Sequence, residues 1–287
     1  LEKSCNDALM QIADKEGVAM FDKYQVLFGF GQSTNVDLPG EPSDASLSTL
    51  VYHADNMHAV ELATSSFGQG VTTSMMQIAT AFCSAINGGY YYEPSVVQRI
   101  EDENGNIVRN LDPVLVRRTI SEDVSAQMRQ FLKSVVTEGT GQKAAVEGYE
   151  VGGKTGTAEK LPRGNGKYIL SFIGFAPVDD PQVVIYVVAD EPELQSGSGE
   201  AAHLFSDIAA AIFPYLNIYK TDETYNIDEA TAEDEPATPI YEGNAPANDV
   251  AGGNDNPYVE ESQGEATTET TTETTTEAST ESSETTT

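Results

Sequence analysis

The chain has 287 residues, of which 46 are acidic and 15 are basic, so its formal net charge is −31 at pH 7. This balance excludes most modes of nucleic-acid binding, because contacts to phosphates need clustered Lys and Arg. Residues 221–287 hold 18 of the acids and no Lys or Arg, whereas residues 1–220 hold all 15 bases. The charge distribution therefore predicts a moderately acidic globular domain over residues 1–220 and a separate acidic tail over residues 221–287.

The sequence also argues against a membrane-spanning helix, a disulfide framework and a His-based metal site. No apolar run approaches the roughly 20 residues that a membrane-spanning helix needs. The two cysteines, Cys5 and Cys83, allow one disulfide at most and are predicted to be free thiols. The three histidines are too few and too scattered for a His-based metal site, so we expect no bound metal.

The first third of the chain is predicted to be helical at its start and then irregular. A first helix is predicted with Gly17 as its C-terminal cap, because apolar residues recur at helical spacing at Ala8, Leu9, Ile12 and Ala13. A second short helix is expected over residues 18–27, and residues 32–70 read as loop-rich. A later helix has an apolar stripe that we expect in the core, formed by Met75, Ile78, Ala79, Phe82 and Ile86.

The middle of the chain carries a hairpin signal followed by a helix signal. Residues 96–102 and 107–111 flank Asn104-Gly105, a dipeptide that favours a two-residue hairpin turn. Ser121 is the expected N-cap of the next helix, which Gly139 and Gly141 end. The apolar positions of that helix are Val124, Met128, Phe131, Leu132 and Val135.

Strand patterns dominate the last part of the globular region. Residues 168–176 and 182–189 are rich in β-formers and predict an antiparallel hairpin. Residues 201–216 predict an amphipathic helix whose apolar face carries Leu204, Ile208, Ile212 and Tyr215. Helices interspersed with antiparallel hairpins predict an α+β domain in which helices flank a sheet.

The periodic patterns of helices and strands end at about Lys220. From Glu265 to Glu281 a glutamate recurs every four residues in a Thr-rich segment. Helical winding would stack these carboxylates on one face, where like charges repel, and Thr is a poor helix former. The tail is therefore predicted to be a disordered, solvated spacer.

Residues 152–157 (GGKTGT) are the sharpest local motif and suggest two chemistries. Gly148, Gly153, Lys154 and Thr155 match the spacing of a phosphate-binding loop. That loop needs an apolar strand before it and a helix that starts at the lysine. The mixed sequence of residues 142–147 and the later glycines fit neither requirement, so the nucleotide-binding interpretation is disfavoured.

The second interpretation is the Lys-Thr-Gly triplet of serine acyl-transferases that act on β-lactams and D-alanyl peptides. In this interpretation Lys154 supplies positive charge beside the nucleophile. Thr155 and Thr157 offer hydroxyls to the carboxylate of the substrate. Gly156 has no side chain, so the substrate backbone can approach the strand closely.

A second triplet near the start of the chain belongs to the same class of enzyme. Ser4-Cys5-Asn6 opens a predicted helix and matches the Ser-x-Asn element, in which the hydroxyl relays a proton and the amide holds the substrate. The alternative is an ordinary helix N-cap, for which Ser and Asn are both favoured.

Beyond these two triplets, residues 1–220 resemble the C-terminal part of the transpeptidase domain of class B penicillin-binding proteins. Several further elements occur in the order that this family has. They are residues 28–31 (FGFG), 36–41 (VDLPGE), 66–70 (SFGQG), 86–89 (INGG), 136–141 (VTEGTG) and 171–177 (SFIGFAP). Ser74 begins a helix where the family often has Thr-Pro, and the stretch after about residue 220 has no counterpart in the shared domain.

The resemblance also indicates an element that the chain lacks. The nucleophile of the family lies in a Ser-x-x-Lys element upstream of Ser-x-Asn. None of the nine lysines here has a serine three residues before it. Because Ser4 matches the second element, we expect the nucleophile to precede Leu1. This chain would then be part of a longer, membrane-anchored protein and inactive when isolated.

The activity implied by the resemblance is that of a D,D-transpeptidase, which cross-links peptidoglycan stem peptides through an acyl-serine intermediate. Ser4 would shuttle a proton, Asn6 would orient the peptide amide, and Lys154 would stabilise charge. Thr155 and Thr157 would bind the terminal carboxylate, and β-lactams would enter by the same route. No metal or organic cofactor is implied. The parent protein would lie at the extracytoplasmic face of the bacterial membrane, in a division or elongation complex.

Two other classes of protein stay open. A serine β-lactamase or a β-lactam-sensing receptor domain shares both triplets, and a non-catalytic scaffold of the cell wall or division machinery could keep the fold without turnover. The long separation between Ser4 and Lys154, together with the further family elements, favours a transpeptidase. The intact Ser4, Asn6, Lys154 and Thr155 argue against a scaffold that has lost its activity.

Overall fold

The computed structural model describes residues 1–193 and 199–221. The acidic tail predicted over residues 221–287 lies, apart from Thr221, outside the described residues. Within the described ranges, no helix has both the length and the apolar character needed to cross a membrane. Cys5 and Cys83 are both free thiols.

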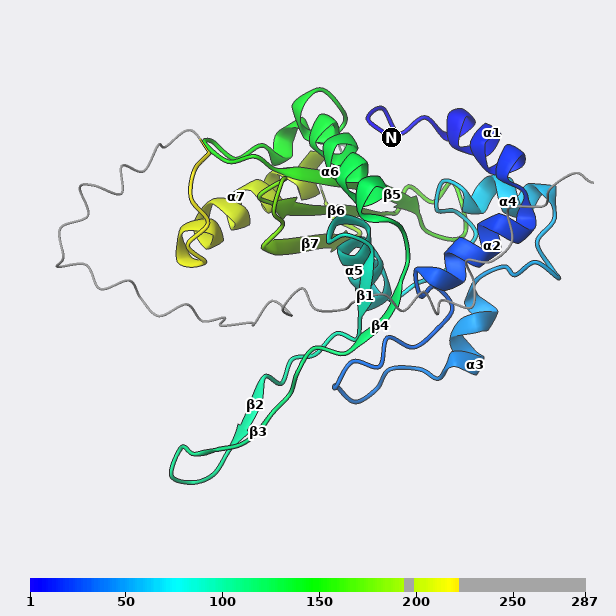
Figure 1. Ribbon diagram of the computed structural model, residues 1–287. Helices are drawn as coiled ribbons and strands as arrows, with labels where there is room; N and C mark the ends of the chain where they lie inside the picture. The colour runs from blue at the N-terminus through cyan, green and yellow to red at the C-terminus, as the bar shows by residue number, and fades with distance from the viewer. Residues whose placement is uncertain (194–198, 222–287) are drawn as a thin grey trace, which may run out of the picture. The chain divides into compact units, whose positions relative to one another are not determined.

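A three-stranded antiparallel sheet forms the centre of the C-terminal half (Figure 1). Its strands are β5 (Gly152–Glu159), β6 (Tyr168–Ala176) and β7 (Val183–Asp190), in the spatial order β5-β6-β7. Lys154 pairs with Ile173 across β5 and β6. The pairing of β6 with β7 confirms the hairpin that the apolar runs predicted, and β5 lies at an edge of the sheet.

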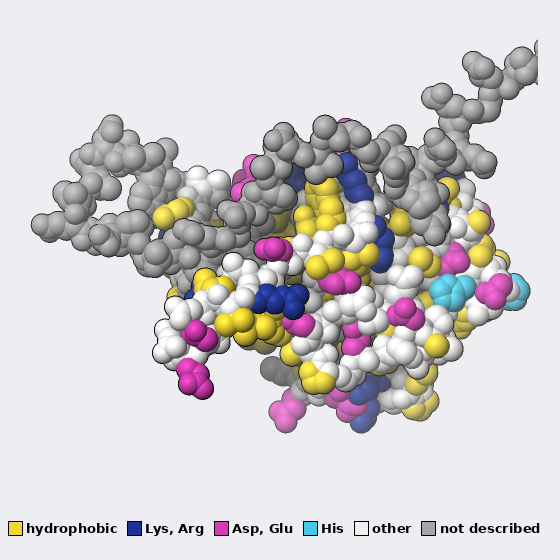
Figure 2. Space-filling model, turned by 60° about the horizontal axis from the view of Figure 1, so that its bottom comes forward, with side chains coloured by type: hydrophobic (Ala, Val, Ile, Leu, Met, Phe, Trp, Pro, Cys, Tyr) yellow, Lys and Arg dark blue, Asp and Glu magenta, His cyan; other side chains and the backbone are white. Residues whose placement is uncertain are grey.

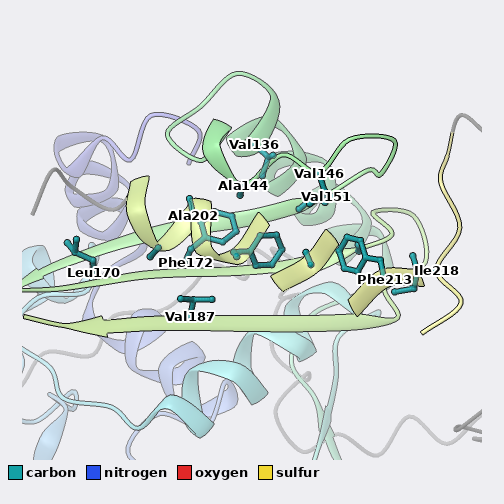
Figure 3. Close-up of a cluster of buried hydrophobic side chains, with 14 residues drawn as sticks. Val136, Ala144, Val146, Val151, Leu170, Phe172, Val187, Ala202, Phe213 and Ile218 are labelled. Carbon is teal, nitrogen blue, oxygen red and sulfur yellow. The ribbon is translucent and has the colours of Figure 1, made fainter. Parts of the chain in front are cut away.

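One face of this sheet is covered by α7 (Gly199–Tyr215). Phe205 of this helix packs on Phe172 of β6, with the ring centroids 4.9 Å apart. Figure 3 shows Phe172 and Phe213 within the cluster of buried side chains between the strands and the helix. This cluster is the largest core of the described residues and holds β6 from one side.

The opposite face is covered by α5 (Met75–Ile86) and α6 (Glu122–Thr137). Phe82 of α5 packs edge-on against Phe175 of β6, with ring centroids 5.9 Å apart. Side chains alternate along a strand, so residues 172 and 175 point to opposite faces. Helices on both faces of an antiparallel sheet confirm the predicted α+β fold.

The buried face of α7 matches the predicted one only in part: Ile208 packs against the core, as predicted. Phe205, Ala209 and Phe213 are fully buried, whereas Leu204 and Tyr215 are exposed. Both faces carry apolar residues at helical spacing, so periodicity alone does not choose between them. The small side chains at 202 and 209 let the helix approach the sheet closely, and this close packing decides its rotation.

The apolar stripe predicted for α5 is also only partly in the core. Met75 is 51% exposed, while Gln77 is buried. The Gln77 side-chain amide donates to the carbonyl of Gln32 at 2.8 Å, and its Oε1 accepts from the Ser74 amide at 2.9 Å. A polar side chain is buried at low cost when it is hydrogen-bonded, so the buried face of this helix is not its most apolar one.

Helix α6 begins where it was predicted to begin, but its buried face again differs from the predicted apolar face. Ser121 is the N-cap, and its Oγ accepts a hydrogen bond from the Val124 amide. Leu132 and Val135 are buried as predicted, but Val124 and Phe131 are exposed. The buried face instead includes Ser125, whose hydroxyl donates to the Ala85 carbonyl and accepts from the Gly88 amide.

The N-terminal part of the chain is helical. The helices α1 (Asn6–Glu16) and α2 (Val18–Leu27) match the predicted ones, and Gly17 joins them with φ = 80°. In the region predicted to be loop-rich lie α3 (Asp44–Leu47), η1 (Ser48–Leu50) and α4 (Ala59–Ser65), which were not predicted. These helices are too short for a periodicity signal to reveal them.

The remaining strands form two small ribbons. The predicted hairpin consists of β2 (Arg99–Glu101) and β3 (Ile107–Asn110), and the carboxylate of Asp102 accepts hydrogen bonds from the turn. The pairing of β1 (Tyr90–Tyr92) with β4 (Leu115–Arg118) was not predicted. In Figure 2, acidic side chains are scattered among hydrophobic and basic ones over the visible face of the described residues.

Candidate active site

The Lys-Thr-Gly motif lies within strand β5, at the edge of the sheet. The two glycines before Lys154 let this strand pack tightly, since a Cβ at Gly153 would lie 2.4 Å from the Phe172 ring. A lysine in the interior of a strand cannot begin a helix. The observed geometry therefore excludes the phosphate-loop interpretation, which needs a helix that starts at Lys154.

Ser4 lies in the turn that precedes α1. Its amide donates to the Leu1 carbonyl at 3.1 Å, and its φ of 50° is in the left-handed region that non-glycine residues rarely adopt. Such a backbone costs about 1–3 kcal/mol and is concentrated at functional sites. The N-cap of α1 is Cys5, without a side-chain cap bond, so the interpretation of Ser4 as a simple N-cap is wrong.

The two triplets meet at the Ser4 and Lys154 side chains. Lys154 Nζ donates a hydrogen bond to Ser4 Oγ. It also donates to the Thr155 carbonyl at 3.0 Å and to Thr155 Oγ1 at 3.4 Å. An ammonium has three donors, and these three oxygens are its partners among the described residues. Burial lowers the pKa of Lys154 below its usual value.

Only some of the other predicted site residues contact the Ser4–Lys154 pair. Thr155 joins the Ser4–Lys154 pair, and Gly156 follows it on β5, where a Cβ would lie 2.4 Å from Ser171 Oγ. Asn6 and Thr157 are exposed, and among the described residues no side-chain hydrogen bond joins either to the pair. Both side chains are therefore open to a ligand at this edge.

A third segment completes the site and was not predicted as part of it. Thr140 follows α6, and its Oγ1 lies 3.0 Å from Thr155 Oγ1. Its amide donates to the Glu2 carbonyl at 3.2 Å, and Lys3 Nζ contacts the Glu138 carbonyl. In the sequence, residues 136–141 resemble an element of the family and end a helix, but neither signal places Thr140 beside Ser4. That proximity depends on long-range packing.

The chemistry available here is proton relay beside a fixed positive charge. A hydroxyl accepts a hydrogen bond and donates another, so Ser4 can pass a proton to a group that lies in front of it. Lys154 can stabilise negative charge that develops at the same place. The Thr155 and Thr157 hydroxyls, on one edge strand, can donate to a carboxylate.

Comparison with known proteins identifies the class to which this fold belongs. Residues 1–210 match the model of the penicillin binding protein transpeptidase domain. Stage V sporulation protein D of Bacillus subtilis is 39% identical, over 76% of this chain and 34% of its own length. Peptidoglycan D,D-transpeptidase FtsI of Escherichia coli is 30% identical, over 76% of this chain and 35% of its own.

Solved structures agree with this assignment. The transpeptidase domain of penicillin-binding protein 3 from Burkholderia pseudomallei has a TM-score of 0.65 and 29% identity, and the match covers 77% of this chain and 65% of that one. Penicillin binding protein 3 of Mycobacterium tuberculosis in complex with ampicillin has a TM-score of 0.67 and 28% identity, over 78% and 52% of the two chains.

The chain therefore belongs to the penicillin-binding protein transpeptidase domain family. It spans about a third of the length of the curated relatives that it matches.

Proposed function

We propose that this chain is the C-terminal part of a D,D-transpeptidase domain that cross-links peptidoglycan stem peptides. The observation that carries the proposal is the hydrogen bond from Lys154 Nζ to Ser4 Oγ. It joins the Ser-x-Asn and Lys-Thr-Gly elements of the family in one site. Relatives that are named peptidoglycan D,D-transpeptidases support the same activity.

The nucleophile is the serine of a Ser-x-x-Lys element, which does not occur among the 287 residues. Its Oγ bonds to the carbonyl carbon of the penultimate D-alanine, and its proton passes to the lysine of the same element. Ser4 relays a proton to the nitrogen of the terminal D-alanine while the peptide C–N bond breaks. The products are an acyl-serine ester and free D-alanine.

The second step resolves the ester. An amine on another stem peptide bonds to the ester carbonyl, the C–O bond to the serine breaks, and the amine proton returns to the serine oxygen. Lys154 stabilises the negative charge of the tetrahedral intermediates in both steps. Asn6 orients the peptide amide, while Thr155 and Thr157 hold the terminal carboxylate and Gly156 lets the substrate backbone approach the strand.

β-Lactams are the expected inhibitors of this site. The same serine opens the lactam ring, but the nitrogen that leaves stays attached to the acyl group. It keeps blocking the position that the second amine needs. The solved relative in complex with ampicillin supports this part of the proposal.

The domain organisation belongs to the proposal as well. Residues 1–220 form the C-terminal part of the transpeptidase domain, and residues 221–287 form an acidic spacer that carries no chemistry of its own. We place the whole protein at the extracytoplasmic face of the bacterial membrane, within a complex that divides or elongates the cell. The name peptidoglycan D,D-transpeptidase among the relatives supports a role in building the cell wall.

A labelled penicillin tests the proposed activity. The whole protein, in which a Ser-x-x-Lys element accompanies this chain, is expected to acquire a covalent label, whereas the isolated 287 residues are expected to acquire none. Release of D-alanine from a stem pentapeptide should accompany labelling. Rapid turnover of a chromogenic β-lactam by the whole protein would instead identify a β-lactamase. An adduct on the isolated chain would contradict the assignment of the nucleophile.

A further inference from the structure

The turn that follows α6, residues 138–141, contacts both halves of the site. On one side, the Thr140 amide donates to the Glu2 carbonyl at 3.2 Å, two residues before Ser4. On the other side, Thr140 Oγ1 lies 3.0 Å from Thr155 Oγ1 on β5. Thr140 is thus hydrogen-bonded to the segment that carries Ser4 and to the strand that carries Lys154.

The position of this turn is set by α6 and not by the site. The Gly141 amide donates to the Val135 carbonyl at 2.9 Å, and Val135 is fully buried. A Cβ at Gly139 would lie 2.6 Å from the Glu2 carbonyl oxygen. The turn is therefore packed between α6 and the N-terminal segment, and this packing holds the backbone of Thr140 in place.

The hydrogen-bond capacity of Thr155 defines what Thr140 can contribute. A threonine hydroxyl has one proton and two acceptor lone pairs. Lys154 Nζ can only donate, so its 3.4 Å contact with Thr155 Oγ1 occupies one lone pair. If the Thr140 hydroxyl donates as well, both lone pairs are occupied and the Thr155 proton is left to bond elsewhere. If Thr155 donated to Thr140 instead, the Thr155 proton would be used within the protein and would not be available to a ligand.

We propose that Thr140 is a positioning residue: its hydroxyl donates to Thr155 Oγ1 and so directs the Thr155 proton toward the carboxylate of the incoming peptide or β-lactam. This inference rests on the proposed function, because it assigns the carboxylate to Thr155. Thr140 itself does not touch the substrate. It acts by leaving Thr155 a single outward-pointing donor.

The test compares acylation of the whole protein by a labelled penicillin in four variants. Thr140→Val keeps the shape of the side chain and removes its donor, and we expect about tenfold slower acylation for the loss of one hydrogen bond. Thr140→Ser restores the donor and should recover the rate to within about threefold. Thr155→Val and the double variant Thr140→Val with Thr155→Val should be equally slow, since Thr140 acts only through Thr155.

Two controls separate positioning from a general effect on structure. Thr137→Val changes an exposed threonine at the end of the same helix, whose hydroxyl has no hydrogen bond to the site among the described residues, and should acylate at the unmodified rate. A penicillin whose carboxylate is a methyl ester lacks the group that Thr155 holds. With this probe Thr140→Val should cost less than it does with the free acid.

The outcomes that would overturn the inference are distinct from failure of the proposed function. Normal acylation of Thr140→Val, while Thr155→Val is slow, would refute the role of Thr140 alone. An undiminished loss from Thr140→Val in the Thr155→Val background would show that Thr140 acts on structure and not through Thr155. If the unmodified whole protein takes up no label, both the proposed function and this inference are wrong.

Discussion

Lys154 Nζ donates a hydrogen bond to Ser4 Oγ across a separation of 150 residues in the chain. The two side chains come from unlike elements: Ser4 lies in a turn before a helix, and Lys154 lies within an edge strand. The turn after α6 is hydrogen-bonded to both segments. The site is therefore sensitive to changes in the packing of α6 as well as to changes in its own side chains.

The pH dependence of acylation should report the protonation of Lys154. Burial lowers the pKa of this lysine from its ordinary value of 10.5, and a neutral amine cannot stabilise a developing negative charge. The alkaline limb of the rate for the whole protein should therefore fall at a pH below 10.5. A rate of acylation that stays constant up to that pH would contradict the requirement for a cationic Lys154.

Packing at Gly139 should be required for the position of Ser4. In Gly139→Ala the new Cβ would lie 2.6 Å from the Glu2 carbonyl oxygen and 2.7 Å from the Val135 backbone, so the N-terminal segment or the end of α6 must move. We expect a loss of stability of about 1–3 kcal/mol, as for other overpacked sites, and slower acylation. Gly199→Ala is the matched control, because the atoms nearest to its Cβ belong to the flexible Lys143 side chain, at 3.2 Å or more. Equal melting temperatures and acylation rates for the two variants would refute the role of Gly139.

The rotation of α7 can be tested by two adjacent substitutions. Phe205→Ala removes a fully buried ring that packs on Phe172 and should destabilise the domain by about 3–5 kcal/mol. Leu204→Ala removes a side chain that is 48% exposed and should change stability by less than about 0.5 kcal/mol. Thermal melting of the whole protein measures both. The reverse order would mean that the face predicted from the sequence is the buried one.

The two cysteines should differ in reactivity toward a thiol reagent. Cys5 is exposed, whereas burial raises the pKa of Cys83 to about 11. At pH 8 one thiol per chain should react rapidly, because the thiolate is the reactive form. In the unfolded chain Cys83 ionises near its ordinary value of 9.0, so its contribution to stability should decline as the pH rises from about 9 to about 11. Equal labelling rates at the two positions would be inconsistent with the burial of Cys83.

The sequence allowed the prediction of those elements whose signals are local. Helix α2, strand β6 and the N-cap Ser121 match their predicted positions, because capping and short-range alternation depend on neighbours in the chain. The buried faces of α5, α6 and α7 could not be predicted in the same way. Gln77 and Ser125 are buried because they meet distant backbone groups, and those partners are not visible in a periodicity pattern.

The residues of the candidate site also differ in whether a local signal in the sequence reveals them. Ser4, Lys154 and Thr155 could be found from two short motifs, since each motif is a fixed local pattern. Thr140 could not, because the family element over residues 136–141 gave it no role and its Gly-Thr-Gly sequence also reads as a helix stop. Only the fold shows that this stop lies against Glu2 and Thr155. The catalytic roles of Ser4, Asn6 and Lys154 stay predictions, as do the substrate-binding roles of Thr155, Gly156 and Thr157.

The central claim is that Ser4 and Lys154 work together in acyl transfer, and the most direct test is the rate of penicillin acylation of the whole protein. Ser4→Ala and Lys154→Ala should each slow acylation by at least about a hundredfold, the scale for loss of a proton relay or a charge-stabilising group. Lys143→Ala, which removes an exposed lysine paired with Glu200, should acylate at the unmodified rate. Rates for Ser4→Ala and Lys154→Ala that equal the rate for Lys143→Ala would contradict the account.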